Sequence, residues 1–292
     1  MKIMGILNVT PDSFSDGGKW ASVDAAIRHG YEMIAQGAEV IDIGGESTRP
    51  GAKALSAAEE WARIGEVVAE LSGHVAVSVD TYHAQTARKS VEAGAAIVND
   101  VSCGRIDPEM FPTIAALDCC YILQHSRGTF QTMNDFAKYD GDLNQIVIAE
   151  MLAQRDRAVA AGISAERIIL DPGLGFSKVG AQDWEILRET ARYLDLGHQL
   201  LIGQSRKRFI GAIASAGLPA AERDYATAAI SGILDGVRGV KSGQGVWAVR
   251  VHNVEATRQA IAVHRIMHRN EATFDAVFAD AHAAAQGRSS DA

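Results

Sequence analysis

Cysteine, basic residues and long apolar runs are all scarce in this 292-residue sequence. Its three cysteines form no metal-binding or disulfide spacing, which favours a reducing compartment. The formal net charge of −8 excludes the broad basic face of a general nucleic-acid-binding protein, although a local basic pocket stays open. No apolar run approaches the ~18 residues of a membrane span, and the N-terminus lacks a signal-peptide pattern. We therefore expect a cytoplasmic protein with neither membrane nor nucleic-acid partners.

Apolar, β-rich segments alternate with segments of helical pattern along the whole chain. Their continuous apolar character is typical of strands buried on both faces of a parallel sheet. The strands are expected at residues 3–9, 39–45, 76–81, 96–102, 119–125, 167–173, 199–205 and 246–253. The helices are expected at residues 22–36, 56–72, 83–93, 108–117, 142–161, 181–193, 223–237 and 254–268.

This alternation predicts an α/β fold, a (β/α)₈ TIM barrel that forms a single domain over residues 1–270. An open doubly wound sheet is the alternative. Residues 271–292 are expected to form a C-terminal helix or tail that is partly disordered.

Polar or charged residues stand near the C-terminal end of every expected strand. In a barrel these ends share one face, where catalytic groups are found. The residues are Asn8, Asp42, Asp80, Asn99, Asp100, His125, Asp171, Ser205, Arg206, Lys207, Arg250 and His252. Any one of them alone could cap a helix or brace a turn, and His125 could be a satisfied core histidine. Their recurrence on every strand favours a functional site.

Three of these residues suggest a flat ligand. Asp80, Asn99 and Asp171 place carboxylate and amide acceptors among apolar walls, which suits a heterocycle rich in N–H donors. Lys207 adds a cation that could donate to ring oxygen or nitrogen. Divalent-metal binding by the same carboxylates is an alternative that the spacing leaves open.

Other residues suggest a phosphate group. Arg250 and His252 alternate along the last strand, and with Asn8 and Mg²⁺ they would make a pyrophosphate site. The basic run at 206–208 could instead be a solvated surface, although it directly follows a buried strand. The loop ESTRPGA (46–52) could cradle phosphate or be an ordinary turn, because the chain has neither the Walker pattern nor the Rossmann glycine pattern.

Several specific motifs occur in a characteristic order: GILNVTPDSFSDGG, VIDIGGESTRPGA, SVDT, IVNDVS, ILDPGLGFSK, SRKRFIG and RVH. In order and spacing they resemble the dihydropteroate synthase family over about residues 1–270. The resemblance implies a pterin-binding TIM barrel, usually a homodimer, that uses Mg²⁺. It implies a transferase of folate biosynthesis that joins 6-hydroxymethyl-7,8-dihydropterin diphosphate to 4-aminobenzoate, yields 7,8-dihydropteroate and pyrophosphate, and is a sulfonamide target.

The resemblance also implies roles for individual residues. The pterin pocket would be formed by Asp80, Asn99, Asp171, Phe176 and Lys207. Asn8 would contact the metal, and the diphosphate would contact Thr48, Arg250 and His252. The surroundings of 4-aminobenzoate would include Phe14, Pro50, Ser205 and Lys207, and Arg49 in the same loop as Pro50 would bind substrate. The residues expected to act in catalysis are Asp42, Asp80, Lys207 and Arg250.

The family mechanism is dissociative: diphosphate leaves first, and the arylamine then attacks a cationic pterin methylene. Such a reaction needs positioning and charge stabilisation rather than a nucleophile–base pair. Asp42 and Asp80 could stabilise the cation. The resemblance also explains the long polar loop after the first strand, because in the family this loop closes over the site and Phe14 would shield the intermediate from water.

Two segments depart from the family pattern. LQHSRGTF at 123–130 replaces a methionine–histidine–methionine pattern and a nearby proline, so that Gln124, Ser126 and Phe130 could reshape the pterin wall. RVHN places Asn253 where aspartate commonly follows. Two alternatives stay open: a pterin-dependent methyltransferase barrel that passes a methyl group to a corrinoid partner, and a non-catalytic paralogue. Release of pyrophosphate would distinguish them from a synthase.

Overall fold

A closed barrel of eight parallel strands, in chain order, lies at the centre of the computed structural model. The structure describes residues 1–10, 18–46, 54–129, 131–214 and 219–268. The strands are β1 (Lys2–Asn8), β2 (Val40–Gly44), β3 (Ala76–Asp80), β4 (Ile97–Asp100), β5 (Cys120–Gln124), β6 (Ile168–Asp171), β7 (Gln199–Ile202) and β8 (Ala248–Val251). Because β8 pairs with β1, the prediction of a TIM barrel is confirmed and the open sheet is excluded.

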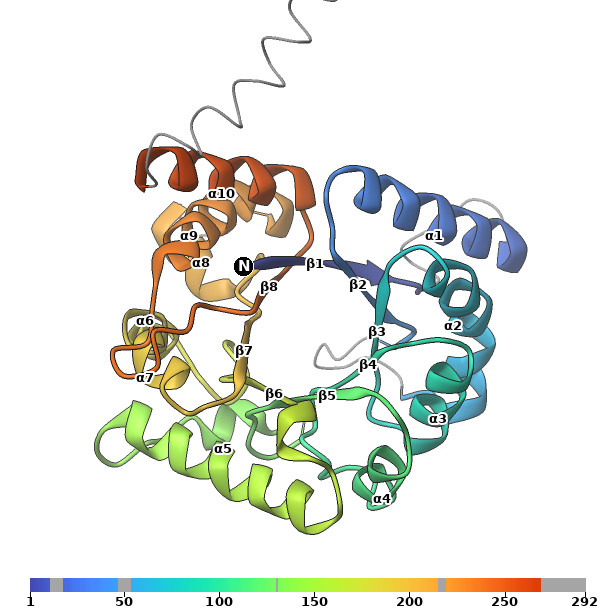
Figure 1. Cartoon of the computed structure of the whole chain (residues 1–292), viewed down its shortest axis with the longest axis horizontal. Coiled ribbons are helices and arrows are strands. Elements are labelled where there is room, and N and C mark those ends of the chain that lie inside the picture. Colours follow the sequence, from blue (N-terminus) through green and yellow to red (C-terminus); the bar gives the residue numbers. More distant parts are fainter. Residues whose placement is uncertain (11–17, 47–53, 130, 215–218, 269–292) are drawn as a thin grey trace, which may run out of the picture.

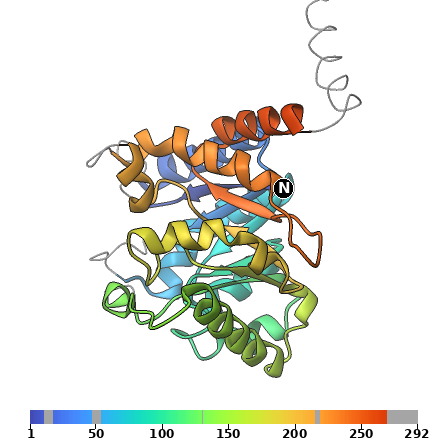
Figure 2. The same ribbon diagram turned by 90° about the vertical axis from the view of Figure 1, so that its left-hand side faces the viewer.

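Helices surround the barrel on all sides (Figure 1). They are α1 (Gly18–Ala35), α2 (Ala57–Ser72), α3 (Ala84–Glu92), α4 (Met110–Ala115), α5 (Leu143–Ala160), α6 (Ala181–Arg188), α7 (Thr190–Leu194), α8 (Arg208–Ala214), α9 (Asp224–Gly236) and α10 (Val254–His268). Short 3₁₀ turns are η2 (Met133–Phe136), η3 (Ala165–Arg167) and η4 (Ala220–Arg223). In the side view the N-terminus lies near the loop that leads into β8 (Figure 2). Among the described helices, none combines the length and apolar character needed to cross a membrane.

The helix boundaries differ from the expected ones in three places. α1 begins at Gly18 rather than near Ser22, and the segment expected as one helix at 181–193 is divided into α6 and α7 at Glu189. α8 occupies a segment for which no helix was expected. It forms because Phe209 and Ile210 are buried against the barrel, 4% and 0% exposed. The expected tail at 271–292 lies outside the described residues.

Two apolar clusters form the core. The larger one fills the space between the strands and the helices. The smaller one plugs the inside of the barrel and consists of Met4, Val40, Ile97, Ile122, Ile169, Leu201 and Ala248. Adjacent strands align these side chains at one level, since Met4 pairs with Val40 and Leu201 pairs with Ala248.

The inner plug explains where polar side chains meet. Side chains two residues apart on a strand point the same way, so the next inward position after each plug residue is one layer closer to the C-terminal end. In five strands that position is polar: Asp42, Asn99, Gln124, Asp171 and Arg250. The barrel is therefore a polar cup with an apolar floor.

Candidate active site

The guanidinium of Arg250 joins two carboxylates inside the cup. Its Nε donates to Asp42 Oδ2 at 2.5 Å, and its Nη2 donates to Asp80 Oδ2 at 2.7 Å. Asn99 Nδ2 also donates to Asp42 Oδ2, at 3.1 Å. Arg250 thus connects β8 to β2 and β3 past the intervening β1, and one cation faces two anions.

This charge arrangement affects the protonation of Asp80. Burial raises the pKa of Asp80 to about 7, Arg250 opposes the increase, and the nearby Asp42 carboxylate adds to it. Because the pair Asp42 and Asp80 carries more negative charge than Arg250 neutralises, the cup favours either a proton or a cationic ligand group.

Several buried polar atoms around the cup have no hydrogen-bond partner within the described part of the chain. They include Asp42 Oδ1, Asn99 Oδ1 and Gln124 Nε2. Gln124 is 5% exposed and pairs in register with Asp171, so its amide belongs to the wall of the cup. Buried polar atoms in folded proteins are nearly always paired. The two unpartnered acceptors and the one unpartnered donor, which lie in the same layer of the barrel, therefore indicate a polar ligand.

Asp171, Lys207 and Phe176 form the opposite wall. Asp171 Oδ1 accepts from the backbone N–H of Gly173 at 2.7 Å, so of its two oxygens Oδ2 is the one that a ligand can use. Lys207 Nζ donates to the backbone carbonyl of Leu174 and lies 5.0 Å from the centre of the Phe176 ring. Burial lowers the pKa of Lys207 to about 8, while Asp171 and Asp183 oppose the decrease.

Ser205 and His252 contact each other at the rim. The backbone N–H of His252 donates to Ser205 Oγ at 3.2 Å, and the hydroxyl lies 2.9 Å from His252 Nδ1. The Ser205 hydroxyl is therefore already engaged with the histidine.

Asn8 ends β1 at the same rim, and Gly44 leaves space beside it. A Cβ added to Gly44 would lie 3.8 Å from Asn8 Oδ1 and 3.5 Å from Asp80 Cβ. In the described ranges there is no cluster of three or more His, Cys, Asp or Glu side chains that could hold a metal ion. Asn8 Oδ1 is a side-chain oxygen that could hold Mg²⁺, an ion that commonly takes only one or two protein oxygens and completes its coordination with substrate phosphates and water.

The structure thus brings most of the predicted site residues to one end of the barrel. These are Asn8, Asp42, Asp80, Asn99, Asp171, Phe176, Ser205, Lys207, Arg250 and His252. Phe14, Thr48, Arg49 and Pro50 lie outside the described residues.

Three polar residues from the same strand ends serve the scaffold instead. Asp100 points away from the cup and accepts from the hydroxyl of Tyr121 at 2.7 Å. Arg206 pairs with both carboxylate oxygens of Asp224, at 2.7 and 2.8 Å. His125 is 1% exposed and has partners on both ring nitrogens, so it is the satisfied core histidine that the sequence left as one possibility.

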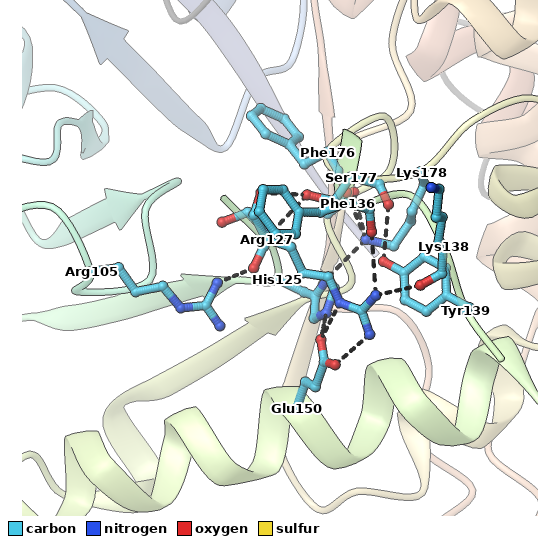
Figure 3. Close-up of polar contacts among 12 residues, drawn as sticks. Arg105, His125, Arg127, Phe136, Lys138, Tyr139, Glu150, Phe176, Ser177 and Lys178 are labelled. Carbon is cyan, nitrogen blue, oxygen red and sulfur yellow. Dashed lines mark hydrogen bonds and ion pairs between the residues drawn. The ribbon is translucent and has the colours of Figure 1, made fainter. Parts of the chain in front are cut away.

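The residues that surround His125 were not predicted from the sequence. Lys178 is 2% exposed, and together with Glu150 and Arg127 it forms a charged network behind the Phe176 wall (Figure 3). Lys178 ends the motif ILDPGLGFSK, which was the one available signal. Glu150 lies on α5, where nothing in the pattern distinguishes it from a surface residue.

The chain is similar to known proteins over nearly its whole length. The family described as "Pterin binding enzyme" matches residues 4–252. A relative from Mycobacterium leprae named dihydropteroate synthase is 41% identical over 272 residues, 90% of this chain and 92% of the relative.

Two solved structures are also similar. The Xanthomonas albilineans dihydropteroate synthase with 4-aminobenzoic acid has a TM-score of 0.81 and 36% identity, and the match covers 92% of this chain and 93% of that chain. The Anaplasma phagocytophilum dihydropteroate synthase with bound 6-hydroxymethylpterin-monophosphate has a TM-score of 0.79 and 38% identity, and the match covers 91% and 98%.

The raised pKa of Asp80 gives a pH-dependent prediction for stability. Between its unfolded pKa of 3.8 and its folded pKa of about 7, the folded state binds the Asp80 proton and the unfolded state does not. The stabilisation from Asp80 is therefore fully present below pH 3.8 and is lost as the pH rises through about 7. Asp80→Asn cannot titrate, so it should reduce the free energy of unfolding more at about pH 4.5 than at about pH 8.

Urea unfolding at both pH values checks this expectation. Asp156→Asn is the control, because the Asp156 side chain is 70% exposed on the outside of α5. A loss of stability in Asp80→Asn that is the same at both pH values would contradict the assigned environment.

Proposed function

The chain belongs to the pterin binding enzyme family, and we propose that within this family it is a dihydropteroate synthase. It transfers the pterin methylene group of 6-hydroxymethyl-7,8-dihydropterin diphosphate to the amine of 4-aminobenzoate and releases pyrophosphate. One observation carries the proposal: the polar cup holds unpartnered buried atoms at Asp42, Asn99 and Gln124 beside a guanidinium. The ligands bound by the X. albilineans and A. phagocytophilum proteins support both substrates.

The pterin ring fits the chemistry of the cup. Asp171 Oδ2 and Asn99 Oδ1 are acceptors for ring N–H groups, and Lys207 is a donor for ring oxygen or nitrogen. Gln124 Nε2 supplies a further donor that the usual methionine would not. Phe176 covers one face of the ring. A planar ligand with N–H and carbonyl edges would therefore satisfy atoms that are otherwise buried without partners.

Arg250 links the pterin to its diphosphate. Its Nε and Nη2 bind Asp42 and Asp80, and we assign Nη1, together with His252, to the diphosphate. When bound through Asn8 and the phosphates, Mg²⁺ would neutralise part of the diphosphate charge. As the carbon–oxygen bond breaks, its electron pair leaves with pyrophosphate, and the positive charge on the pterin methylene lies near the carboxylates. The arylamine nitrogen then attacks the methylene and loses a proton.

The second substrate is assigned to the rim. Because the Ser205 hydroxyl is held by His252, we place the carboxylate of 4-aminobenzoate at the backbone N–H of Ser205, beside the stem of Lys207. Phe14, Thr48, Arg49 and Pro50 keep the roles implied by the resemblance as part of the proposal.

An apolar outer face supports the homodimer that we also propose. Tyr225 and Ile233 on α9 are 87% and 68% exposed, and Val263 and Met267 on α10 are 60% and 72% exposed. The two helices pack closely at Gly232, where an added Cβ would lie 3.0 Å from the carbonyl oxygen of Ala260. Large exposed apolar side chains on two helices that pack against each other favour an interface at this part of the surface.

A cytoplasmic location stays part of the proposal. Its support is that Cys103, Cys119 and Cys120 are all free thiols, as expected in a reducing compartment.

The reaction itself is the first test. The purified protein with both substrates and Mg²⁺ should release pyrophosphate and form 7,8-dihydropteroate in equal amounts. A sulfonamide, which presents the same aniline ring, should inhibit competitively against 4-aminobenzoate. The proposal is wrong if pyrophosphate release and product are absent, and methyl transfer to a corrinoid protein would identify the methyltransferase alternative instead.

Asp171→Asn should weaken pterin binding and leave the fold intact. The change replaces an acceptor by an N–H donor that faces ring N–H groups, and an unpaired buried group costs about 1–3 kcal/mol. We expect the Kd of the pterin substrate, measured by calorimetry, to rise by about 5- to 150-fold, which corresponds to that cost. The control is Asp118→Asn, the same substitution at an exposed position. Unchanged affinity in a folded Asp171→Asn protein would remove Asp171 from the pocket.

Ile233→Lys should shift the protein from dimer to monomer, because a buried ammonium without a partner is unfavourable in an apolar interface. Sedimentation velocity measures the change. Val240→Lys is the matched control, since Val240 is 86% exposed in the loop before β8 and outside the α9–α10 face. A monomeric wild type, or a dimer that persists in Ile233→Lys, would contradict the assigned interface.

A further inference from the structure

Lys178 is a buried cation that none of the assigned roles uses. Its Nζ lies 2.8 Å from His125 Nδ1, 3.1 Å from the carbonyl oxygen of Gly173 and 3.0 Å from the carbonyl oxygen of Phe176 (Figure 3). An ammonium has three N–H donors, and these three acceptors use all of them. Loss of the proton would leave one acceptor without a donor, so the geometry is that of a charged lysine.

The partners of His125 fix its orientation. Lys178 donates to Nδ1, so that Nε2 carries the hydrogen and donates to Glu150 Oε2 at 2.9 Å. Burial lowers the pKa of His125 to about 3, with a further decrease from Lys178. His125 is therefore neutral. It bridges Glu150 and Lys178 by hydrogen bonds, so that the position of Lys178 depends on that of Glu150.

Arg127 closes the network on the far side. Its Nε and Nη2 bind the two Glu150 oxygens at 2.9 and 2.5 Å, and its guanidinium stacks 4.0 Å above the ring of Tyr139. Tyr139 donates to the carbonyl of Ser177, and the Ser177 hydroxyl donates to the carbonyl of Arg127. The chain of contacts thus returns to the residue next to Lys178.

The network holds the segment 172–178, which carries the Phe176 wall. Phe176 N–H donates to the Gly173 carbonyl at 3.0 Å, and Lys178 donates to the carbonyls of both residues. Gly173 has a φ of +66° and lies so close to β5 that an added Cβ would be 1.9 Å from the His125 carbonyl oxygen. The turn is therefore tight, and Lys178 is the donor at its centre.

We propose that Lys178 is a positioning residue for the pterin substrate: it fixes Phe176 and the adjoining Asp171 in the geometry that binds the ring. This inference rests on the proposed function, because it takes the ligand of the cup to be a pterin. Lys178 acts through the two backbone carbonyls and does not touch the substrate.

The unfavourable burial of this cation supports the proposal. Burial lowers the pKa of Lys178 to about 7, and Asp183 and Asp171 oppose the decrease. A buried charge of this kind is often no more stabilising than an apolar residue of similar size. Lys178, unlike an apolar residue such as methionine, supplies three directed hydrogen bonds that define one conformation of the turn.

The test compares Lys178→Met, Glu150→Gln and a control, Lys138→Met. Lys138 is exposed in a loop of the same network, where only its backbone carbonyl accepts from Arg127, so the control removes the same charge without removing a side-chain contact. The KM values for both substrates are measured, as is the Kd of 6-hydroxymethylpterin monophosphate by calorimetry.

We expect Lys178→Met to raise the pterin KM and Kd about tenfold, while the KM for the arylamine substrate changes less than about twofold. Glu150→Gln should raise the pterin values by about threefold, because it loosens Lys178 only through His125. Lys138→Met should leave all of them unchanged. A residue with a merely structural role would lower the active fraction, and hence kcat, without separating the two KM values.

Unchanged pterin affinity in Lys178→Met, or equal increases in both KM values, would overturn the inference. If Lys178→Met does not fold, Glu150→Gln decides, because the Glu150 side chain is 33% exposed and the substitution keeps its shape. If the wild type forms no product, the proposed synthase activity fails, and the Kd values of the variants still decide the role of Lys178.

Discussion

Arg250 between Asp42 and Asp80 is the interaction on which the rest of the site depends. Asp42 is fully buried above the apolar plug, and a buried carboxylate is stable only when it is paired. The guanidinium provides that pairing from β8, the strand that closes the barrel on β1. Closure of the barrel therefore also brings together the cation and its two anions, which come from opposite ends of the barrel sequence.

Much of the fold follows from sequence pattern, because continuous apolar runs and their spacing depend on local composition. Local polar patterns are informative in the same way. Ser56 and Glu59 have the spacing of a capping box, and both of its reciprocal hydrogen bonds are present at the start of α2. The start of α1, the break at Glu189 and the helix α8 were not predictable in this way. In α8, burial of Phe209 and Ile210 decides the structure, and burial depends on contacts with distant segments.

The site shows the same division between local and distant causes. The two-residue period of a strand predicts that Asp42, Asn99, Asp171 and Arg250 share the inner face, given a barrel. The strand period does not predict whether Arg206 or Lys207 faces the cup. In the structure Arg206 has a φ of +59° and its side chain pairs with Asp224, while the next side chain, that of Lys207, lies at the cup. Nor could it reveal Lys178, whose side-chain partner His125 is 53 residues away and behind the wall.

The charged groups around Arg250 and around Lys178 have complementary tasks in the proposed reaction. The group around Arg250 holds one cation against two carboxylates, so an additional positive charge on the pterin methylene would be stabilised as the diphosphate leaves. The group around Lys178 lies behind the wall: Arg127 pairs with its carboxylate, Glu150, and Lys178 interacts electrostatically with the cup through Asp171. Asp171 and Lys207 lie between the two groups, and the turn 172–178 joins Asp171 to Lys178. Because Lys178 holds the turn by hydrogen bonds to backbone carbonyls, the wall that positions the ring stays in place while the charge in the cup changes during the reaction.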